Sequence, residues 1–170
     1  MSNLSDNILK AECKRLWKEA FGDSDEFISS FMELYYSKEN MLYIEDKGKI
    51  VSMLHIIPFG LSNKPIAYMY AVATDITARG KGLATQLIKQ AIEYAKEKGY
   101  KAIITLPAES ELQKFYSQFG FCGSYAVKFE TKDKFDFGTG DSKKDFITVL
   151  PFEKDVLTFF KENEITTLRR

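Results

Sequence analysis

The feature that most constrains the fold is a change of hydrophobic period near residue 80. Residues 66–76, IAYMYAVATDI, are rich in β-branched and aromatic side chains, as expected of a strand. A glycine-containing turn, ARGKG at 78–82, follows directly. The apolar residues after the turn then recur with the spacing of one helix face until Gly99; they are Ala84, Leu87, Ile88, Ala91, Ile92 and Ala95. The sequence therefore predicts a strand, a glycine turn and a helix in direct succession.

The segment after this helix reads as a second strand of the same sheet. Residues 100–106, YKAIITL, form a buried apolar run that Pro107 ends. Because a helix connects the two strands, we expect them to lie parallel in a βαβ crossover.

Two amphipathic helices are predicted at the N-terminal end of the chain. Apolar residues at helical spacing place them at about 7–21 and 25–37. Asp23 and Glu26, three residues apart, resemble a capping box for the second helix.

A β-hairpin is predicted after these helices. The strand-like runs 41–45 and 49–59 are separated by a turn signal, Asp46-Lys47-Gly48. The second run is apolar on both of its faces, which favours a central strand covered on both sides. Residues 60–65, GLSNKP, read as a loop to the next strand.

The C-terminal part of the chain is predicted to alternate between short helices and strands. The expected elements are a helix at 112–119 stopped by Gly120, a strand at 121–130, a polar connection at 131–144, a last strand at 145–151 and a terminal helix around Val156, Leu157 and Phe160. No repeat or linker divides the chain. We therefore predict one α+β domain, residues 1–170, with helices on both faces of a mixed sheet.

The charge balance and the cysteine pattern exclude several classes of protein. Twenty-four basic and twenty-four acidic side chains cancel, so no net charge favours nucleic acid or an anionic membrane as a partner. Cys13 and Cys122 lack metal-ligand spacing, and the chain has one histidine, so no metal site is predicted. The N-terminal segment carries charges throughout, and no apolar run is long enough to span a membrane. We expect a soluble cytoplasmic protein.

The glycine turn has the properties of an anion site. A helix entrance offers backbone N–H groups without intrahelical partners and a partial positive charge. Gly80 and Gly82 remove side chains that would block those amides, and Arg79 and Lys81 add charge. A phosphate or pyrophosphate is the natural ligand, although a glycine turn at this place is also common where its dihedral angles alone require glycine.

Two well-known phosphate patterns do not fit this turn. A Walker-type loop requires G-x-x-x-x-G-K-[ST], and the spacing around Gly82 lacks it. A dinucleotide fingerprint requires G-x-G-x-x-G/A, but GKGLAT places Thr85 at the third small position. The next strand also ends in Leu106-Pro107 and not in an acidic residue for a ribose hydroxyl.

A third pattern, Q/R-x-x-G-x-G/A, is matched by Arg79, Gly82 and Ala84. This stretch resembles the acyl-CoA loop of the GCN5-related N-acetyltransferase (GNAT) superfamily, and the likeness in element order covers about residues 8–130. The later stretch LPAESELQKFYSQFGF resembles the family segment N-x-x-A-x-x-x-Y, with Tyr116 at the tyrosine. Glu109 and Leu112 stand where that segment has asparagine and alanine.

The resemblance implies a fold and a cofactor. The fold is a central mixed sheet that is splayed between two parallel strands, and the cofactor is acetyl-CoA. The pantetheine arm is expected along the first of those strands, and the pyrophosphate at the amides of the turn. The cofactor-binding residues implied in this way are Val72, Ala73, Thr74, Arg79, Gly80, Lys81, Gly82, Leu83, Ala84 and Thr85.

The resemblance also implies a proton donor. Attack of an amine on a thioester passes through an oxyanion and expels a thiolate, which benefits from a nearby acid. Tyr116 is the candidate general acid, although its place on the apolar face of a helix equally suits a core tyrosine. His55 is the one histidine and a candidate base, against the alternatives of a packed core residue and of deprotonation by water.

The function predicted from these features is N-acetyl transfer from acetyl-CoA to a primary amine, by direct attack in a ternary complex without a metal. The acceptor is a small molecule or a peptide or protein amine, and the chain is a monomer or homodimer. Residues 143–170 are expected either to close the acceptor pocket or to make a dimer contact. The alternatives are a non-catalytic acyl-CoA-binding or regulatory module with the same fold, and a domain whose glycine turn binds nothing. Candidate acceptor-side residues are Asp23, Asp25, Glu26, Glu33, Tyr35, Tyr36, Tyr68 and Tyr70.

Overall fold

The computed structural model of the protein describes residues 4–138 and 145–170. Within these residues, seven strands form one mixed sheet in the order β1-β2-β3-β4-β6-β5-β7, and helices flank it. The predicted α+β class with a central mixed sheet is therefore confirmed. None of the described helices is long and apolar enough to span a membrane.

The chain folds as two compact units, which are described separately below. The first unit consists of Met1–Ile57 and Tyr70–Ala91, and the second of Pro58–Met69 and Ile92–Arg170. Strands β2 (Lys49–Leu61) and β3 (Lys64–Thr74) and helix α3 (Leu83–Glu97) each contribute residues to both units. The single domain predicted for residues 1–170 stays a prediction.

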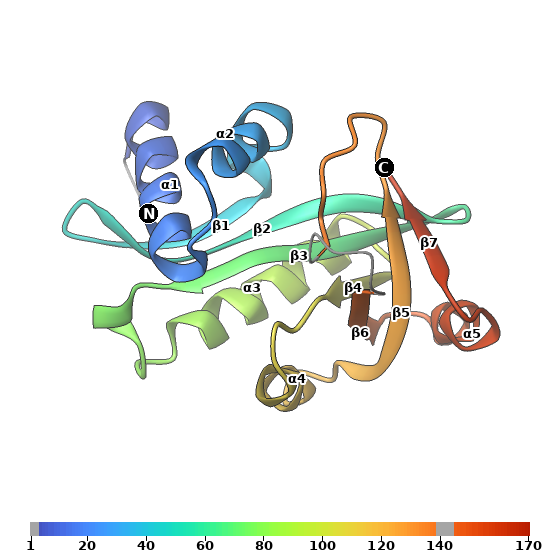
Figure 1. The fold of residues 1–170 in the computed structure, drawn as a ribbon. Helices are drawn as coiled ribbons and strands as arrows, with labels where there is room; N and C mark the ends of the chain where they lie inside the picture. The colour runs from blue at the N-terminus through green and yellow to red at the C-terminus, as the bar shows by residue number, and fades with distance from the viewer. Residues whose placement is uncertain (1–3, 139–144) are drawn as a thin grey trace. The chain divides into compact units, whose positions relative to one another are not determined.

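In the first unit, two helices lie side by side (Figure 1). Helix α1 (Asp6–Phe21) ends at Gly22, which has a left-handed φ of 70°, and helix α2 (Asp25–Leu34) follows after a short turn. Their apolar faces form a core in which the rings of Trp17 and Phe31 are 4.8 Å apart. The predicted helices are thus present, but the second ends three residues early, at Leu34.

The predicted capping box is wrong. The N-cap of α2 is Ser24, whose Oγ accepts a hydrogen bond from the amide of Phe27 at 3.1 Å. Asp23 instead accepts a hydrogen bond from Trp17 Nε1 at 2.8 Å. A buried indole N–H requires an acceptor, and this requirement fixes the Asp23 side chain.

The predicted hairpin is present in the first unit. Strands β1 (Met41–Asp46) and β2 pair antiparallel from Met41 opposite His55 to Asp46 opposite Lys49. Lys47 and Gly48, the two turn residues, have φ values of 52° and 81°. Positive φ at both turn positions is the geometry that suits the twist of a two-residue hairpin.

The predicted strand, glycine turn and helix are β3, the turn before α3, and α3 itself (Figure 1). A 3₁₀ turn, η2 (Ile76–Ala78), lies between strand and helix, and Gly99 ends α3 with a φ of 83°. The following strand β4 (Ala102–Thr105) is parallel to β3, with Ile66 opposite Ala102 and Tyr68 opposite Ile104. The βαβ prediction is therefore confirmed.

The loop predicted at 60–65 is wrong, because strand continues through most of it. Strand β2 extends to Leu61 and β3 begins at Lys64, which leaves a two-residue turn with Ser62 at a φ of 56°. Gly60 lies in β2, and another backbone makes an ordinary van der Waals contact at this position. A Cβ on Gly60 would be 3.5 Å from the carbonyl oxygen of Arg169, its partner on β7.

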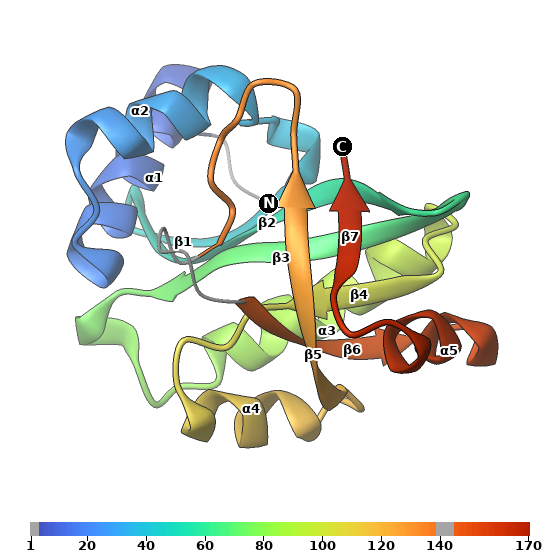
Figure 2. The same ribbon diagram turned by 45° about the vertical axis from the view of Figure 1, so that its right-hand side comes forward.

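The second unit holds the remaining strands and two helices. Its elements are α4 (Ser110–Ser117), β5 (Cys122–Glu130), β6 (Asp145–Pro151), α5 (Lys154–Glu162) and β7 (Thr166–Arg169). Strand β6 is antiparallel to both β4 and β5, and β7 runs beside β5 in the same direction (Figure 2). Strand β7 is absent from the sequence prediction, in which 145–151 is the last strand. Part of the polar connection at 131–144 lies outside the described residues.

Candidate active site

The strand that leads to the glycine turn, β3, contains a left-handed residue at Ala71. This residue has a φ of 54°, in the left-handed region that non-glycine residues rarely adopt. A left-handed residue within a strand reorients the side chains that follow it, which here begin at Val72. Such strain costs roughly 1–3 kcal/mol and persists only where the surroundings impose it.

Tyr68 and Tyr70, which both precede Ala71 on β3, have different surroundings. Tyr68 is 2% exposed; its hydroxyl donates to the carbonyl oxygen of Phe137 at 3.1 Å, so it is a core residue of the second unit. Tyr70 is half-buried and lies 5.6 Å from the rings of both Trp17 and Phe31 in the first unit.

The C-terminal part of β3 extends beyond its paired segment with β4. Strand β4 ends at Thr105, which the parallel register sets opposite Met69, whereas β3 continues to Thr74. Within the first unit, the carbonyl of Ala73 accepts a hydrogen bond from Ser52 Oγ at 3.3 Å. The same Ser52 hydroxyl lies 3.0 Å from the hydroxyl of Thr74.

Asp75 organises the turn between β3 and the glycines. Its Oδ1 accepts hydrogen bonds from the amide of Thr77 at 3.0 Å and from the hydroxyl of Thr77 at 2.7 Å. Its Oδ2 lies 3.1 Å from the Arg15 guanidinium, which also donates to the carbonyl of Ile50 at 2.8 Å. The hydrogen bonds from Thr77, and then Arg15, lower the pKa of Asp75. This carboxylate is therefore ionised at neutral pH and fixes the turn.

The glycine turn itself is open. Gly80 and Gly82 have φ values of 78° and 77°, and a Cβ built on either would meet nothing within 4 Å. These two positions therefore favour glycine because of their positive φ angles and not because a side chain would collide with a neighbour. Arg79 Nε donates to the carbonyl of Thr74 at 3.2 Å, and Gln86 N donates to the carbonyl of Gly82 at 3.0 Å in the first turn of α3.

The ten residues predicted to bind the cofactor all belong to the first unit. Ala73 is buried, residues 79–82 are exposed, and the others are half-buried. The amides at the start of α3 lie directly after two exposed glycines, so they suit an anionic group.

Tyr116, the predicted acid, belongs to the second unit. It lies on α4 and is 6% exposed, with the rings of Phe115 and Phe121 at 5.4 and 5.7 Å. Burial raises the pKa of Tyr116, and a side-chain hydrogen bond with Thr105 lowers it by less.

His55 has the surroundings of a packed residue. It is 2% exposed, its Nε2 lies 3.5 Å from Cys13 Sγ, and the ring of Phe31 is 4.9 Å away. Burial lowers the pKa of His55 to about 3 and raises the pKa of the Cys13 thiol to about 12. Both groups are therefore neutral near pH 7, and they do not form a charged catalytic pair.

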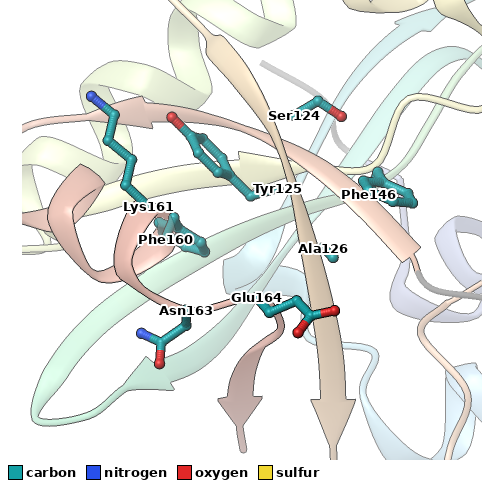
Figure 3. Close-up of a pocket in the computed structure, with 8 residues that line it drawn as sticks. All are labelled: Ser124, Tyr125, Ala126, Phe146, Phe160, Lys161, Asn163 and Glu164. Atoms are coloured by element: carbon teal, nitrogen blue, oxygen red, sulfur yellow. The ribbon is translucent and has the colours of Figure 1, made fainter.

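Two cavities lie near the surfaces of the separate units. One of about 580 Å³ in the first unit is bordered by charged side chains and by the Asp75–Thr77 turn. The other, of about 400 Å³, lies between β5, β6 and the end of α5 in the second unit. Figure 3 shows Tyr125 and Phe160 beside each other in this second cavity, and their rings are 5.4 Å apart.

Comparison with known proteins places the chain in a family. The sequence profile described as "Acetyltransferase (GNAT) domain" matches residues 9–123. The chain belongs to the GNAT acetyltransferase family. An uncharacterized N-acetyltransferase of Escherichia coli K12, YhbS, is 30% identical over 79 residues. That alignment covers 45% of this chain and 45% of the relative, so it matches less than half of the relative's length.

Solved GNAT structures share the fold. The YhbS structure from E. coli in complex with CoA has a TM-score of 0.66 at 20% identity, over 94% of this chain and 83% of that one. A structure from Corynebacterium glutamicum, described as histone acetyltransferase HPA2 and related acetyltransferase, has a TM-score of 0.65 at 18% identity. The match covers 87% of this chain and 93% of the C. glutamicum chain. These likenesses confirm the GNAT fold predicted from the glycine turn.

Three residues that hold the strands and the turn beside the candidate site residues were not predicted from the sequence. Ser52 donates a hydrogen bond to the carbonyl of Ala73, Asp75 accepts one from the amide of Thr77, and Thr105 donates one to the carbonyl of Met69. Asp75 carried a signal, since an aspartate directly after a strand and two residues before Thr77 suits a local cap. Ser52 and Thr105 lie inside apolar strands, where their partners depend on strand register and leave no pattern in the sequence.

Proposed function

We propose that the protein is an N-acetyltransferase that moves the acetyl group of acetyl-CoA to a primary amine by direct attack in a ternary complex. Membership of the GNAT family supports transfer of an acetyl group. The observation that carries the proposal is the open turn at Gly80 and Gly82, directly before the free amides of α3. In this proposal residues 72–74 and 79–85 bind the cofactor.

The residues of this turn fit a pyrophosphate. The two left-handed glycines leave the backbone uncovered, and the exposed Arg79 and Lys81 side chains supply positive charge. The segment Val72–Thr74 lies beyond the paired part of β3 with β4, and its backbone groups suit the amides of a pantetheine arm. When bound, acetyl-CoA supplies an activated thioester.

Tyr116 is the proposed proton donor to the departing thiolate. Its pKa is raised by burial, so the phenol is protonated at neutral pH and available as an acid. The amine loses its proton to water in this proposal, because His55 is buried and its pKa is lowered to about 3.

A non-catalytic acyl-CoA-binding module remains the second candidate, favoured by two departures from the family pattern at the start of α4. Glu109 occupies the N-cap position of this helix without making a side-chain capping hydrogen bond, at a place where the family pattern has asparagine. Leu112, which stands in place of the family's alanine, is 38% exposed.

Calorimetry with CoA, combined with a thiol-release assay over a panel of amines, separates the two candidates. The panel contains small amines, polyamines, and peptides with free N-termini or lysines. The N-acetyltransferase proposal predicts that CoA binds and that at least one amine class releases thiol from acetyl-CoA above the hydrolysis rate. Binding of CoA without thiol release from any class supports the module instead, and absence of binding contradicts both.

A further inference from the structure

Five rings gather into an aromatic wall within the first unit. They are Trp17 on α1, Phe31 and Tyr35 at α2, His55 on β2 and Tyr70 on β3. The ring of Phe31 contacts the other four, with Trp17 and His55 at 4.8 and 4.9 Å, and Tyr70 and Tyr35 at 5.6 and 6.2 Å. Trp17, Phe31 and His55 are buried, whereas Tyr35 and Tyr70 are half-buried. Tyr35 and Tyr70 are therefore the rings of this wall that a ligand can reach.

The aromatic wall follows directly on the strand segment proposed for the pantetheine arm. In the proposed function the pyrophosphate lies at the turn before α3, and the arm follows β3 from Thr74 back to Val72. Tyr70 is two residues farther along the same strand, which at the rise of a β-strand is about 7 Å. All of these residues belong to the first unit. The thioester end of the arm therefore points toward Tyr70.

The glutamates of α2 face away from the aromatic wall. Glu26 and Glu33 lie five residues before Phe31 and two residues after it, which places them roughly 140° and 160° around the helix from that ring. Both glutamates are exposed. A carboxylate touches the wall through Asp23, whose Oδ2 accepts the hydrogen bond of Trp17 Nε1 at 2.8 Å. Helix α2 thus turns rings, and not its glutamates, toward β3.

A surface of this kind distinguishes amines by the groups that they carry. Apolar and aromatic groups gain free energy when they leave water and pack against rings. One ammonium group can lie over the face of a ring. The further ammonium groups of a polyamine would lose hydration that rings do not replace.

We propose that Tyr35 and Tyr70 form the acceptor site, and that the acceptor is a primary monoamine that carries an aromatic group. The inference deepens the proposed function and rests on it, because the aromatic wall borders the thioester only if the cofactor lies along β3. The apolar surroundings also favour the neutral form of the amine, which is the form that attacks.

The transfer at this site balances as follows. The ammonium form of the acceptor gives one proton to water, and the nitrogen lone pair then forms a C–N bond with the thioester carbonyl carbon. The nitrogen loses a second proton, the C–S bond breaks with its electron pair on sulfur, and the thiolate takes up a proton. The net products are the amide, the CoA thiol and one proton in water.

The test compares three amines: phenethylamine, ethylamine, which lacks the ring, and putrescine, which has a second amine. Calorimetry measures the affinity of each amine for the protein saturated with CoA, and thiol release from acetyl-CoA gives kcat/KM. Ratios between amines are compared across variants, because this cancels their different intrinsic reactivities. The variants are Tyr70→Ala, Tyr70→Phe and Tyr43→Ala. Tyr43 is the matched control, a half-buried tyrosine on β1 for which no ring contact joins it to the wall among the described residues.

We expect phenethylamine to bind at least roughly 10-fold more tightly than ethylamine or putrescine, and to have the highest kcat/KM. Tyr70→Ala should remove most of this preference and leave the affinity for CoA unchanged, which also shows that the variant is folded. Tyr70→Phe keeps the ring and should keep the preference, as should Tyr43→Ala.

Three outcomes overturn the inference. They are a natural protein that binds ethylamine or putrescine as tightly as phenethylamine, an equal loss for all three amines in Tyr70→Ala, and an equal loss of the preference in Tyr43→Ala. Thiol release without a preference for phenethylamine leaves the proposed function standing. A preference seen by calorimetry without thiol release from any amine supports the amine site and contradicts the proposed function.

Discussion

At the scale of single residues, burial separates the two side chains that the sequence pattern offered as acid and base. Tyr116 keeps its proton because burial raises its pKa. His55 loses its proton because burial lowers its pKa to about 3, and its neighbours are Cys13, Trp17 and Phe31. The structure therefore keeps Tyr116 as a candidate acid and makes His55 a packed residue.

Tyr116→Phe removes one hydroxyl and leaves the ring. We expect kcat to fall roughly 10²-fold, the usual scale of general acid catalysis, while CoA affinity stays within about twofold. Steady-state thiol release and calorimetry measure the two quantities. An unchanged kcat would return Tyr116 to the role of a core residue.

His55 makes the free energy of unfolding depend on pH in the acidic range. In the folded protein its pKa is about 3, against an ordinary value of 6.5. The unfolded chain therefore gains a proton below pH 6.5 that the folded chain does not gain until about pH 3. The contribution of this pKa difference to the free energy of unfolding is complete above pH 6.5. It falls by about 1.4 kcal/mol per pH unit as the pH drops from 6.5 toward 3.

His55→Leu removes this titration without adding a charge. Urea unfolding from pH 7 to 5 should give a free energy that falls more steeply for the natural protein than for the variant. Parallel slopes would show that folding does not lower the pKa of His55. The comparison of slopes is independent of any packing loss that the variant suffers at all pH values.

At the scale of elements, the strand–turn–helix segment was predictable because its signals are local. The change of period from β3 to α3, the glycines with positive φ and the stop at Gly99 all lie in one stretch of sequence. The family signature at Arg79, Gly82 and Ala84 is part of this stretch, so fold and cofactor loop could be predicted together.

Elements whose pairing is long-range were not predictable in the same way. Strand β7 has four residues and joins the sheet through backbone pairs with β5 and with Gly60 on β2. The left-handed Ala71 and the Thr105 contact with Met69 also arise from register, which the sequence does not encode locally. The capping role predicted for Asp23 is wrong because its partner, the Trp17 indole, lies outside the capping motif.

The turn η2 gives a test of how the glycine segment is held. Asp75→Ala removes both the cap on Thr77 and the ion pair with Arg15, and we expect KM for acetyl-CoA to rise roughly 10-fold with kcat nearly unchanged. Asp75→Asn keeps an oxygen that accepts from the Thr77 amide, and it should lie close to the natural protein if the cap dominates. Steady-state kinetics at saturating amine measure both. A fall in kcat at constant KM would contradict a role in holding the cofactor loop.

At the scale of the whole molecule, the chain has no net charge to attract an anionic ligand from a distance. Twenty-four basic side chains balance twenty-four acidic ones, so affinity for CoA must come from local groups. The family match at residues 9–123 includes residues of both compact units. The acceptor amine and the oligomeric state are not encoded in these features, because the pattern prescribes backbone contacts to the cofactor and few side chains for the acceptor.

The central claim, that the glycine turn before α3 binds the pyrophosphate of CoA, is tested most directly by calorimetry of CoA with Gly82→Asp. Gly48→Asp is its matched control, because Gly48 has a similar φ of 81° and also has nothing within 4 Å of an added Cβ. We predict that the natural protein and Gly48→Asp bind CoA with similar affinity, and that Gly82→Asp shows no measurable binding because its carboxylate repels the phosphates. Retained affinity in Gly82→Asp would show that this turn is not the cofactor site.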